Sequence, residues 1–314
     1  MIDYTIFYRD SLPLDRSWEQ KYDLFISAYD ESERVQTVFQ KANASRKLWI
    51  LHDEYGFSPS EHPHGEIFSC QSADEGEFIF QLFQYIGGDL SARKICIDIT
   101  GCMRPHIAFA LRYLADSGTS KLDVIYSEPS RYKKKESTQF SSSPVDLVRQ
   151  VVGFEGVVNN DTSNDLLIIG AGYEHELIAD VADEKDKARK LILLGLPSLR
   201  ADMYQQNAWR TQLAKDAIGE STSSKLFVPA NDPFVTATVL SELIANQEML
   251  KPITNLYLSP IATKAQTLGF ALYYLAERAG TSTSIIFPFA RSYARDSAIG
   301  IARAWRYVIE FPVA

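Results

Sequence analysis

The sequence predicts an α/β protein made of two tandem Rossmann-like units, each with a parallel sheet, that are related by internal duplication. A short apolar run, a small polar turn and an apolar-periodic helix follow one another in residues 95–115, as a strand, loop and helix would. The same order returns in residues 255–276, where Phe270–Ala276 differs from Phe109–Ala115 at one position. Arg189–Leu194 also repeats the Arg-Lys-Leu start of Arg46–Leu51. Alternating strands and helices of this kind favour parallel, doubly wound sheets.

The first half is expected to alternate short β-branched strands with helices. Strands are expected at Tyr4–Tyr8, Tyr22–Ser27, Arg46–Leu51, Ile95–Ile99 and Leu122–Tyr126. Asp30 or Ser32 could cap a helix that runs through Val38 to Ala44, and a second helix is expected at Phe78–Ile86, ended by two glycines. Residues 133–143 are interpreted as a polar connection.

The second half follows the same plan after a polar boundary at residues 159–164. Strands are expected at Asp165–Gly170, Arg189–Leu194, around Leu256, at Ser284–Pro288 and at Tyr307–Phe311, with an inserted strand at Lys225–Pro229. Helices are expected at Trp209–Ala217 and Val235–Glu248, and the tail from Gly300 could begin as a helix. The expected units are therefore residues 1–158 and 159–314.

The bulk composition limits the kind of function. With 314 residues, 46% of them hydrophobic, the chain can bury a substantial core, and its net charge of −8 argues against a dedicated duplex-DNA binder. We expect no signal peptide and no membrane span, and hence a cytoplasmic protein. The three cysteines have no metal-ligand spacing. No resident metal and no other cofactor are predicted.

The predicted strand ends carry hydroxyls, cations and glycines. Because the carboxyl ends of parallel strands share one edge, where helix N-termini favour anions, we expect these residues to bind a small anionic ligand such as a nucleotide. The candidate ligand-binding residues are Ser27, Tyr29, Thr100, Gly101, Arg104, Arg131, Gly170, Gly172, Ser259, Thr263, Lys264 and Arg291.

Two patterns in the sequence suggest enzymatic alternatives. Gly170-Ala-Gly172 follows a strand, but the third glycine position of a dinucleotide-binding motif holds His175, which disfavours a nicotinamide cofactor. The acidic residues Asp30, Glu31, Asp53 and Glu54 could gather for metal binding or acid–base chemistry, although helix caps and a solvated loop explain them equally well. We therefore assign no catalytic residue, and the prediction leans toward a protein without enzymatic activity.

The segment Ile97-Asp-Ile-Thr-Gly-Cys-Met-Arg104, followed by an alanine-rich helix, resembles the fourth-strand motif of CARF-type ligand sensors. Leu258–Lys264 looks like a degenerate second copy that retains a Thr-Lys pair. CARF domains are Rossmann-like and pair to form one pocket for a cyclic oligoadenylate, and SAVED domains are similar but fuse two such units in one chain. This chain departs from the motif at Cys102, which replaces a glycine, and at Arg104, which displaces the lysine; no effector segment follows.

The resemblance implies a sensor in prokaryotic defence that binds a cyclic oligonucleotide-like second messenger between its halves and signals to a separate protein effector. Two other classes of function stay open. One is an enzyme that acts on a nucleotide or nucleotide sugar through the acidic edge. The other is a ligand-free scaffold subunit of a defence complex.

Overall fold

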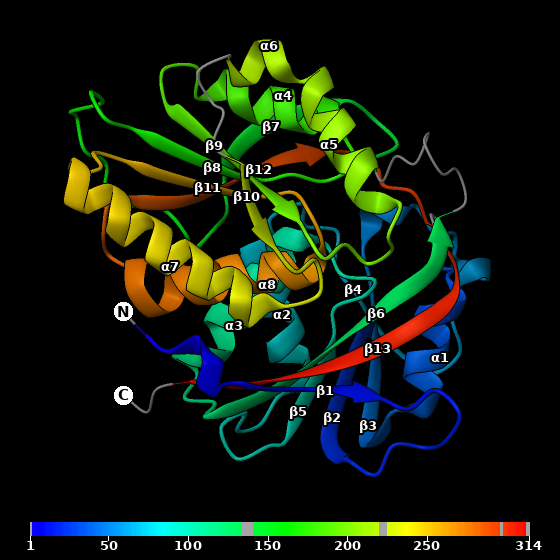
Figure 1. Cartoon of the computed structure of the whole chain (residues 1–314). Helices are drawn as coiled ribbons and strands as arrows, with labels where there is room; N and C mark the ends of the chain where they lie inside the picture. Colours follow the sequence, from blue (N-terminus) through cyan, green and yellow to red (C-terminus); the bar gives the residue numbers. More distant parts are fainter. Residues whose placement is uncertain (1, 133–140, 220–224, 296–297, 312–314) are drawn as a thin grey trace. The chain divides into compact units, whose positions relative to one another are not determined.

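The computed structural model describes residues 2–132, 141–219, 225–295 and 298–311, and these form two compact units. The described parts of Phe7–Ser142 and Ser292–Ala314 make a seven-stranded unit, and residues 2–6 with Ser143–Arg291 make a six-stranded unit. Each unit is a Rossmann-like α/β sandwich, as the sequence predicts (Figure 1). No helix in the described residues has the length and apolar character that a bilayer crossing requires.

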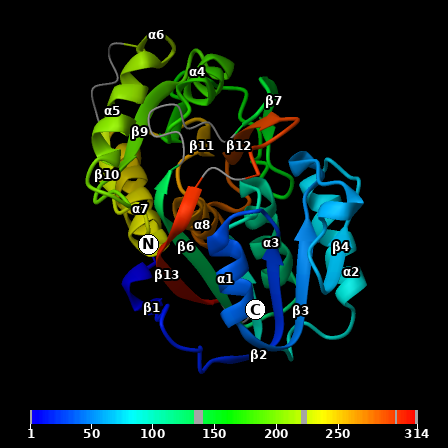
Figure 2. The same ribbon diagram turned by 90° about the vertical axis from the view of Figure 1, so that its right-hand side faces the viewer.

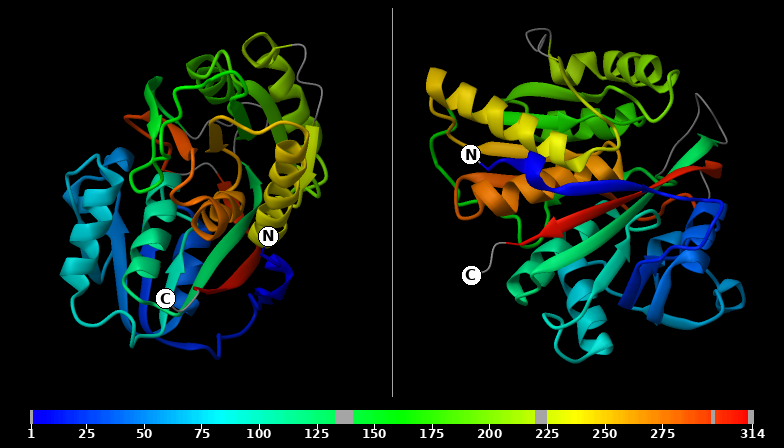
Figure 3. Two further views of the ribbon diagram at one scale, coloured as in Figure 1. Left: turned by 90° about the vertical axis from the view of Figure 1, so that its left-hand side faces the viewer. Right: turned by 60° about the horizontal axis from the view of Figure 1, so that its bottom comes forward.

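The seven-stranded unit has the strand order β1-β13-β6-β5-β2-β3-β4. The five strands from β6 to β4 are parallel, and β13 and β1 extend the sheet in the antiparallel sense. The right-hand view of Figure 3 shows β1 (blue) alongside β13 (red) at this edge. The strands are β1 Tyr8–Leu12, β2 Lys21–Ala28, β3 Asn43–Leu51, β4 Glu66–Ser69, β5 Ile95–Asp98, β6 Lys121–Tyr132 and β13 Ala298–Glu310.

Helices cover both faces of this sheet because the buried strands are apolar on both sides. The helices are α1 Glu33–Lys41, α2 Glu75–Ile86 and α3 Arg104–Asp116. Phe25, Cys96 and Ile125 face Val38 of α1, whereas their neighbours in the strands face α2 and α3. α1 therefore lies on one face, against β6 and β13 among others, and α2 and α3 pack together on the other (Figure 2).

The six-stranded unit has the order β10-β9-β8-β11-β12-β7, with only β7 antiparallel to its neighbour. The strands are β7 Val145–Gln150, β8 Leu166–Gly170, β9 Arg189–Gly195, β10 Lys225–Val228, β11 Leu256–Pro260 and β12 Thr283–Ala290. The helices are α4 His175–Glu184, α5 Met203–Leu213, α6 Lys215–Ile218, α7 Pro233–Leu250 and α8 Lys264–Tyr273. Figure 1 shows α4, α5 and α6 on one side of this sheet and α7 and α8 on the other.

The two units have the same topology, which supports the predicted duplication. Numbered within each unit, the parallel strands run 3-2-1-4-5, and an antiparallel strand follows the fifth. The first helix of each unit, α1 or α4, packs on the fifth strand and on that antiparallel strand. The helices after the third and fourth strands also pair in both units, α2 with α3 and α7 with α8.

In each sheet, the antiparallel strand that pairs with the fifth parallel strand comes from the other half of the sequence. β7 follows β6 in the chain but pairs with β12, and β13 follows β12 but pairs with β6. The sequence suggested one boundary, after residue 158. The compact units instead exchange segments, so their boundaries differ from it. Residues 143–158 belong with the second-half sheet, and the described residues after 291 belong with the first-half sheet.

Several local features differ from the expected ones. The short strand β4 was not predicted, and the supposed insertion β10 is its counterpart in the second sheet. Tyr4–Ile6 is a 3₁₀ turn that precedes β1, and the tail from residue 298 is one long strand without a helix, because it pairs with β6 along its length. Residues 133–140, interpreted as a polar connection, lie outside the described residues.

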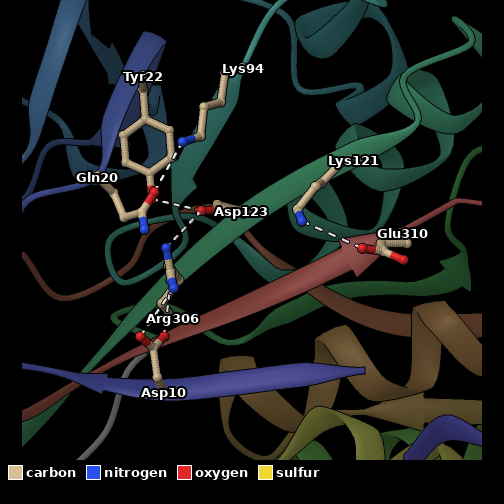
Figure 4. A network of polar contacts seen from close by, with 8 residues as sticks. All are labelled: Asp10, Gln20, Tyr22, Lys94, Lys121, Asp123, Arg306 and Glu310. Atoms are coloured by element: carbon tan, nitrogen blue, oxygen red, sulfur yellow. Dashed lines mark hydrogen bonds and ion pairs between the residues drawn. The ribbon is translucent and has the colours of Figure 1, made fainter. Parts of the chain in front are cut away.

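A buried ion network at the amino ends of the parallel strands holds β13 and β1 to the seven-stranded sheet (Figure 4). Arg306 of β13 donates to both carboxylate oxygens of Asp10 on β1, at 2.9 and 3.1 Å. Its Nη1 lies 3.5 Å from Oδ2 of Asp123, which also accepts a hydrogen bond from the Tyr22 hydroxyl at 2.7 Å. This network lies away from the carboxyl edge where the ligand-binding residues are predicted.

Candidate functional site

The carboxyl edge of each sheet contains a topological switch point, where chain connections leave in opposite directions. In the strand order 3-2-1-4-5 this point lies between the first and fourth strands, and ligands of open α/β sheets bind there. It falls between β2 and β5 in one unit and between β8 and β11 in the other. Ten of the twelve predicted residues lie in or directly after these four strands, and Arg131 and Arg291 follow at the ends of the fifth strands.

A buried polar network lies at the switch point of the seven-stranded unit. The Ser27 hydroxyl donates to Oδ2 of Asp98 at 2.9 Å, and the Thr100 backbone N–H donates to Oδ1 at 2.9 Å. The Thr100 and Ser127 hydroxyls are 3.0 Å apart, and the Ser127 backbone N–H donates to the hydroxyl oxygen of Thr100. All four side chains are fully buried, so this network fixes the loop that leads into α3.

Asp98 has an unusual protonation equilibrium for a carboxyl group. Burial raises the pKa of Asp98 to about 6, against the hydrogen bonds from Thr100 and Ser27 that lower it. Its exposed fraction is zero, so it orders the loop and is not accessible to a ligand.

Glycines allow the two loops of each switch point to touch. A Cβ on Gly101 would meet the carbonyl oxygen of Ala28, and a Cβ on Gly172 would meet that of Ile261 at 2.6 Å. The Tyr55 hydroxyl also donates to the Gly101 oxygen at 2.9 Å. Close loop packing therefore accounts for both glycines.

The helix that follows the fourth strand has the opposite charge pattern from the helix that follows the first. α1 begins with Glu33, and α4 is preceded by Glu174, so anions already lie at both N-termini. α3 and α8 have no acidic residue in their first turns and begin with cations, Arg104 and Lys264. A cation next to the positive end of a helix dipole is unfavourable, and an added anion relieves this. The pattern recurs in both units.

The switch point of the six-stranded unit is lined by a capping box. Thr263 Oγ1 accepts from the Gln266 backbone N–H at 3.2 Å and donates to the Ala230 oxygen at 2.5 Å. Gln266 Oε1 in turn accepts from the Thr263 backbone N–H at 3.3 Å. Ser259 is fully buried, and Gly170 lies against the Phe270 ring. Lys264, at the first position of α8, is half-exposed.

Tyr29 lies among aromatic rings beyond the end of β2. Its ring centroid is 5.4 Å from that of Trp49 and 5.0 Å from that of Phe57. Arg295 covers Phe57 at 4.6 Å and donates to backbone carbonyls of Tyr55 and Gly56, so it ties down the loop after β3. Tyr29 is only half-buried, so part of it remains accessible.

The cations at the ends of the fifth strands lie in different environments. Arg131 is exposed near the end of β6. Arg291 is 81% exposed, and its Nε is 2.7 Å from Oδ2 of Asp146 in β7. The Arg291 pair joins β12 to its antiparallel neighbour, so this residue has a structural contact of its own.

Sequence reasoning missed Arg34, which is 7% exposed in the first turn of α1. Its Nη1 donates to the Ser127 oxygen at 3.0 Å, so it joins the polar network described above. The available signal was an arginine beside Val35 and one turn before Val38, on the apolar face of an amphipathic helix. An arginine on a buried face needs polar partners, and this one finds them at the carboxyl edge.

The acidic residues lie in different environments. Asp30 is buried and accepts from the Ser32 backbone N–H at 2.8 Å, whereas Glu31 is exposed and 3.9 Å from Arg295. Burial raises the pKa of Glu54, and the carboxylates of Asp53 and Glu75 raise it further. In the part of the chain that the structure describes, no group of three or more His, Cys, Asp or Glu side chains is placed to hold a metal ion.

These edges and their topology define a protein with two Rossmann-like α/β units. No family model matches the chain, and no curated protein matches it. Among solved structures it is similar to a CobK precorrin-6A reductase, at 13% identity over 87% of this chain and 90% of that one, with a TM-score of 0.26. A likeness this distant does not bear on activity.

Proposed function

We propose that the protein is a non-enzymatic sensor of a nucleotide second messenger, bound through its phosphates at the carboxyl edges of its Rossmann-like units. The observation that carries this proposal is the pair of cations, Arg104 and Lys264, that begin the helices after the fourth strands. A cation there costs about 0.3–1 kcal/mol against the helix dipole. A bound phosphate would turn the cation into a favourable contact at the positive end of the helix dipole.

A nucleotide fits these edges better than a simple inorganic anion does. Tyr29 offers a half-exposed ring near the switch point, and base–aromatic stacking contributes about 1–3 kcal/mol per base. The resemblance of residues 97–104 and 258–264 to CARF and SAVED motifs supports a cyclic oligonucleotide, a separate effector and a role in prokaryotic defence.

Binding is favoured over catalysis because most hydroxyls at the edges are already engaged, whereas that of Ser259 is fully buried. Ser27, Thr100 and Ser127 hydrogen-bond within their own buried network, and Thr263 caps α8. Such hydroxyls orient loops and are poor candidates for nucleophiles.

The test is calorimetric titration with a panel of cyclic and linear nucleotides. We expect micromolar or tighter binding, weakened about tenfold by Arg104→Ala or Lys264→Ala and about 100-fold by both, since each charged hydrogen bond contributes about 1.5 kcal/mol or more. Arg112→Ala is the matched control, because Arg112 pairs with Asp116 at the far end of α3. Absence of heat with every nucleotide would refute the proposal.

A second candidate is an enzyme that acts on a nucleotide or nucleotide sugar, favoured by the raised pKa of Glu54 beside Asp53 and Glu75. A carboxyl group with a raised pKa can serve as a general acid. Nucleotide turnover that disappears in Glu54→Gln, followed by chromatography of the products, would select this candidate over sensing.

A further inference from the structure

Arg295 holds the loop that follows β3 in the seven-stranded unit. Its guanidinium donates from Nε to the Tyr55 carbonyl oxygen at 2.6 Å and from Nη2 to that of Gly56, and it lies 4.6 Å from the centroid of the Phe57 ring. Nη1 is 2.7 Å from a carboxylate oxygen of Glu61. A guanidinium can donate to several partners at once, so one side chain holds the loop through its backbone, a ring and a carboxylate.

Residues 292–295, the strap, lie where the chain returns to the seven-stranded unit after β12. The Tyr293 N–H donates to the Glu54 carbonyl oxygen at 3.0 Å, which adds a backbone contact between the strap and the loop after β3. The chain leaves this unit beside the strap, because the Ser142 N–H donates to the Ser292 oxygen at 2.8 Å. Both crossings of the chain between the units therefore meet at the strap.

The loop after β3 holds, in turn, the residues that begin α3. The Tyr55 hydroxyl donates to the Gly101 carbonyl oxygen at 2.9 Å, and the Met103 N–H donates to Nε2 of His52 at 3.4 Å. Tyr55 and His52 are 8% and 1% exposed, so water has little access to replace either contact. Met103 is the N-cap of α3, and Arg104 is its first residue. The placement of Arg104 therefore depends on the loop that the strap holds.

We propose that Arg295 is a positioning residue for the phosphate-binding edge, and that the loop after β3 couples Arg104 to the strap. The inference rests on the proposed function for the role of Arg104, and it deepens that function by assigning the part of the chain that responds to the ligand. Coupling between two sites is reciprocal, so a phosphate held at Arg104 would stabilise the strap by the same factor by which the strap improves phosphate binding. A sensor needs such a response.

Two conservative variants interrupt this chain of contacts at different steps. Arg295→Lys keeps the positive charge beside Glu61 but cannot donate to both carbonyls and cover the aromatic ring at the same time. Tyr55→Phe keeps the buried ring and removes only the hydroxyl that donates to Gly101.

The matched control is Arg46→Lys. Arg46 also donates to a backbone carbonyl, that of Ile86 at 2.8 Å, and it pairs with Glu66 at 2.6 Å, so its partners lie at the end of α2 and in β4. Its side chain is 33% exposed, close to the 30% of Arg295. The control thus removes contacts of the same kind at another place in the same unit.

Hydrogen exchange resolved to single amides tests these contacts on the full chain without a ligand. The reporters are the N–H groups of Cys102 and Met103, which donate to the Ile99 oxygen and to His52 Nε2. We expect Arg295→Lys and Tyr55→Phe to speed exchange of both amides about threefold or more, a usual coupling within one hydrogen-bond network. Exchange of the same amides should stay unchanged in the control.

Calorimetry with inorganic pyrophosphate, at fixed ionic strength, tests the effect on Arg104. We expect Arg295→Lys to weaken pyrophosphate binding about threefold in the wild-type background and to have no effect once Arg104 is replaced by alanine. A merely structural role would lower the melting temperature but leave the affinity of the folded protein unchanged.

The outcomes separate this inference from the proposed function. Unchanged exchange of the two reporter amides in Arg295→Lys and Tyr55→Phe overturns the inference even if nucleotides bind. Faster exchange with unchanged pyrophosphate affinity, or with the same loss of affinity in Arg104→Ala, overturns the positioning role. Faster exchange in a protein that binds neither pyrophosphate nor any nucleotide supports the coupling and overturns the sensor proposal. Melting temperatures without probe show whether Arg295→Lys is folded, and if it is not, Tyr55→Phe decides both tests.

Discussion

Replacing Arg306 by methionine should locally destabilise the antiparallel edge of the seven-stranded sheet. The Arg306 side chain is 10% exposed and that of Asp123 is 5% exposed, so the substitution leaves a buried carboxylate without its cation. Removing one partner of a buried pair costs about 3–5 kcal/mol. Asp123 keeps the Tyr22 hydroxyl, and Asp10, 30% exposed, can be rehydrated, which places the expected loss near the lower limit, at about 3 kcal/mol.

Hydrogen exchange measured by mass spectrometry suits this test, because it reports on β1 and β13 without assuming that the whole chain unfolds in one step. A loss of about 3 kcal/mol corresponds to roughly 100-fold faster exchange of the protected amides in β13. Adding Asp123→Asn to Arg306→Met should recover part of the protection, because no unpaired buried charge then remains.

Lys121→Met is the matched control. Lys121 and Glu310 join the same two strands, β6 and β13, at 3.4 Å, but their side chains are 55% and 67% exposed (Figure 4). An exposed pair of this kind contributes less than about 1 kcal/mol. If Arg306→Met accelerates exchange in β13 no more than Lys121→Met does, the reasoning from burial is refuted.

Three further predictions follow from the same structure. Asp98→Asn should stabilise the protein at pH 7.5, because the folded state raises the pKa of Asp98 to about 6, whereas the unfolded chain ionises this carboxyl near pH 4. Between these two pH values the wild type loses about 3 kcal/mol of its free energy of unfolding, and Asp98 causes no further loss above pH 6. Urea unfolding at pH 4 and pH 7.5 measures this, and an unchanged difference between the two pH values in Asp98→Asn would contradict it. Gly101→Ala should lower stability by about 1–3 kcal/mol in thermal melts, since its Cβ would collide with the Ala28 carbonyl; a melt identical to that of the wild type would show that the loop yields freely. Separately expressed fragments 1–158 and 159–314 should be poorly soluble alone and soluble when co-expressed, because each carries the antiparallel strand of the other's sheet; two soluble, monomeric fragments would argue against the observed strand exchange.

The sequence by itself determined the elements that depend on neighbouring residues. Apolar runs such as Ile95–Ile99 define buried strands, and helical spacing after Arg104 defines the helix that follows. The repeat of Phe109–Ala115 at Phe270–Ala276 indicated two copies of one plan, and the strand orders of the two sheets support it. Strand ends then located the carboxyl edges, because parallel strands end on the same side.

Only the tertiary structure decided which strands and side chains meet across long separations. β13 pairs with β6, from Tyr132 opposite Ala298 onward, although the apolar pattern of β13 would suit the fifth strand of either sheet. Arg34 reaches the ligand edge because α1 packs against β6, a contact between residues 93 positions apart that no local pattern encodes. Periodicity records which face of an element is buried, whereas the partner of that face is chosen by the packing of the whole unit.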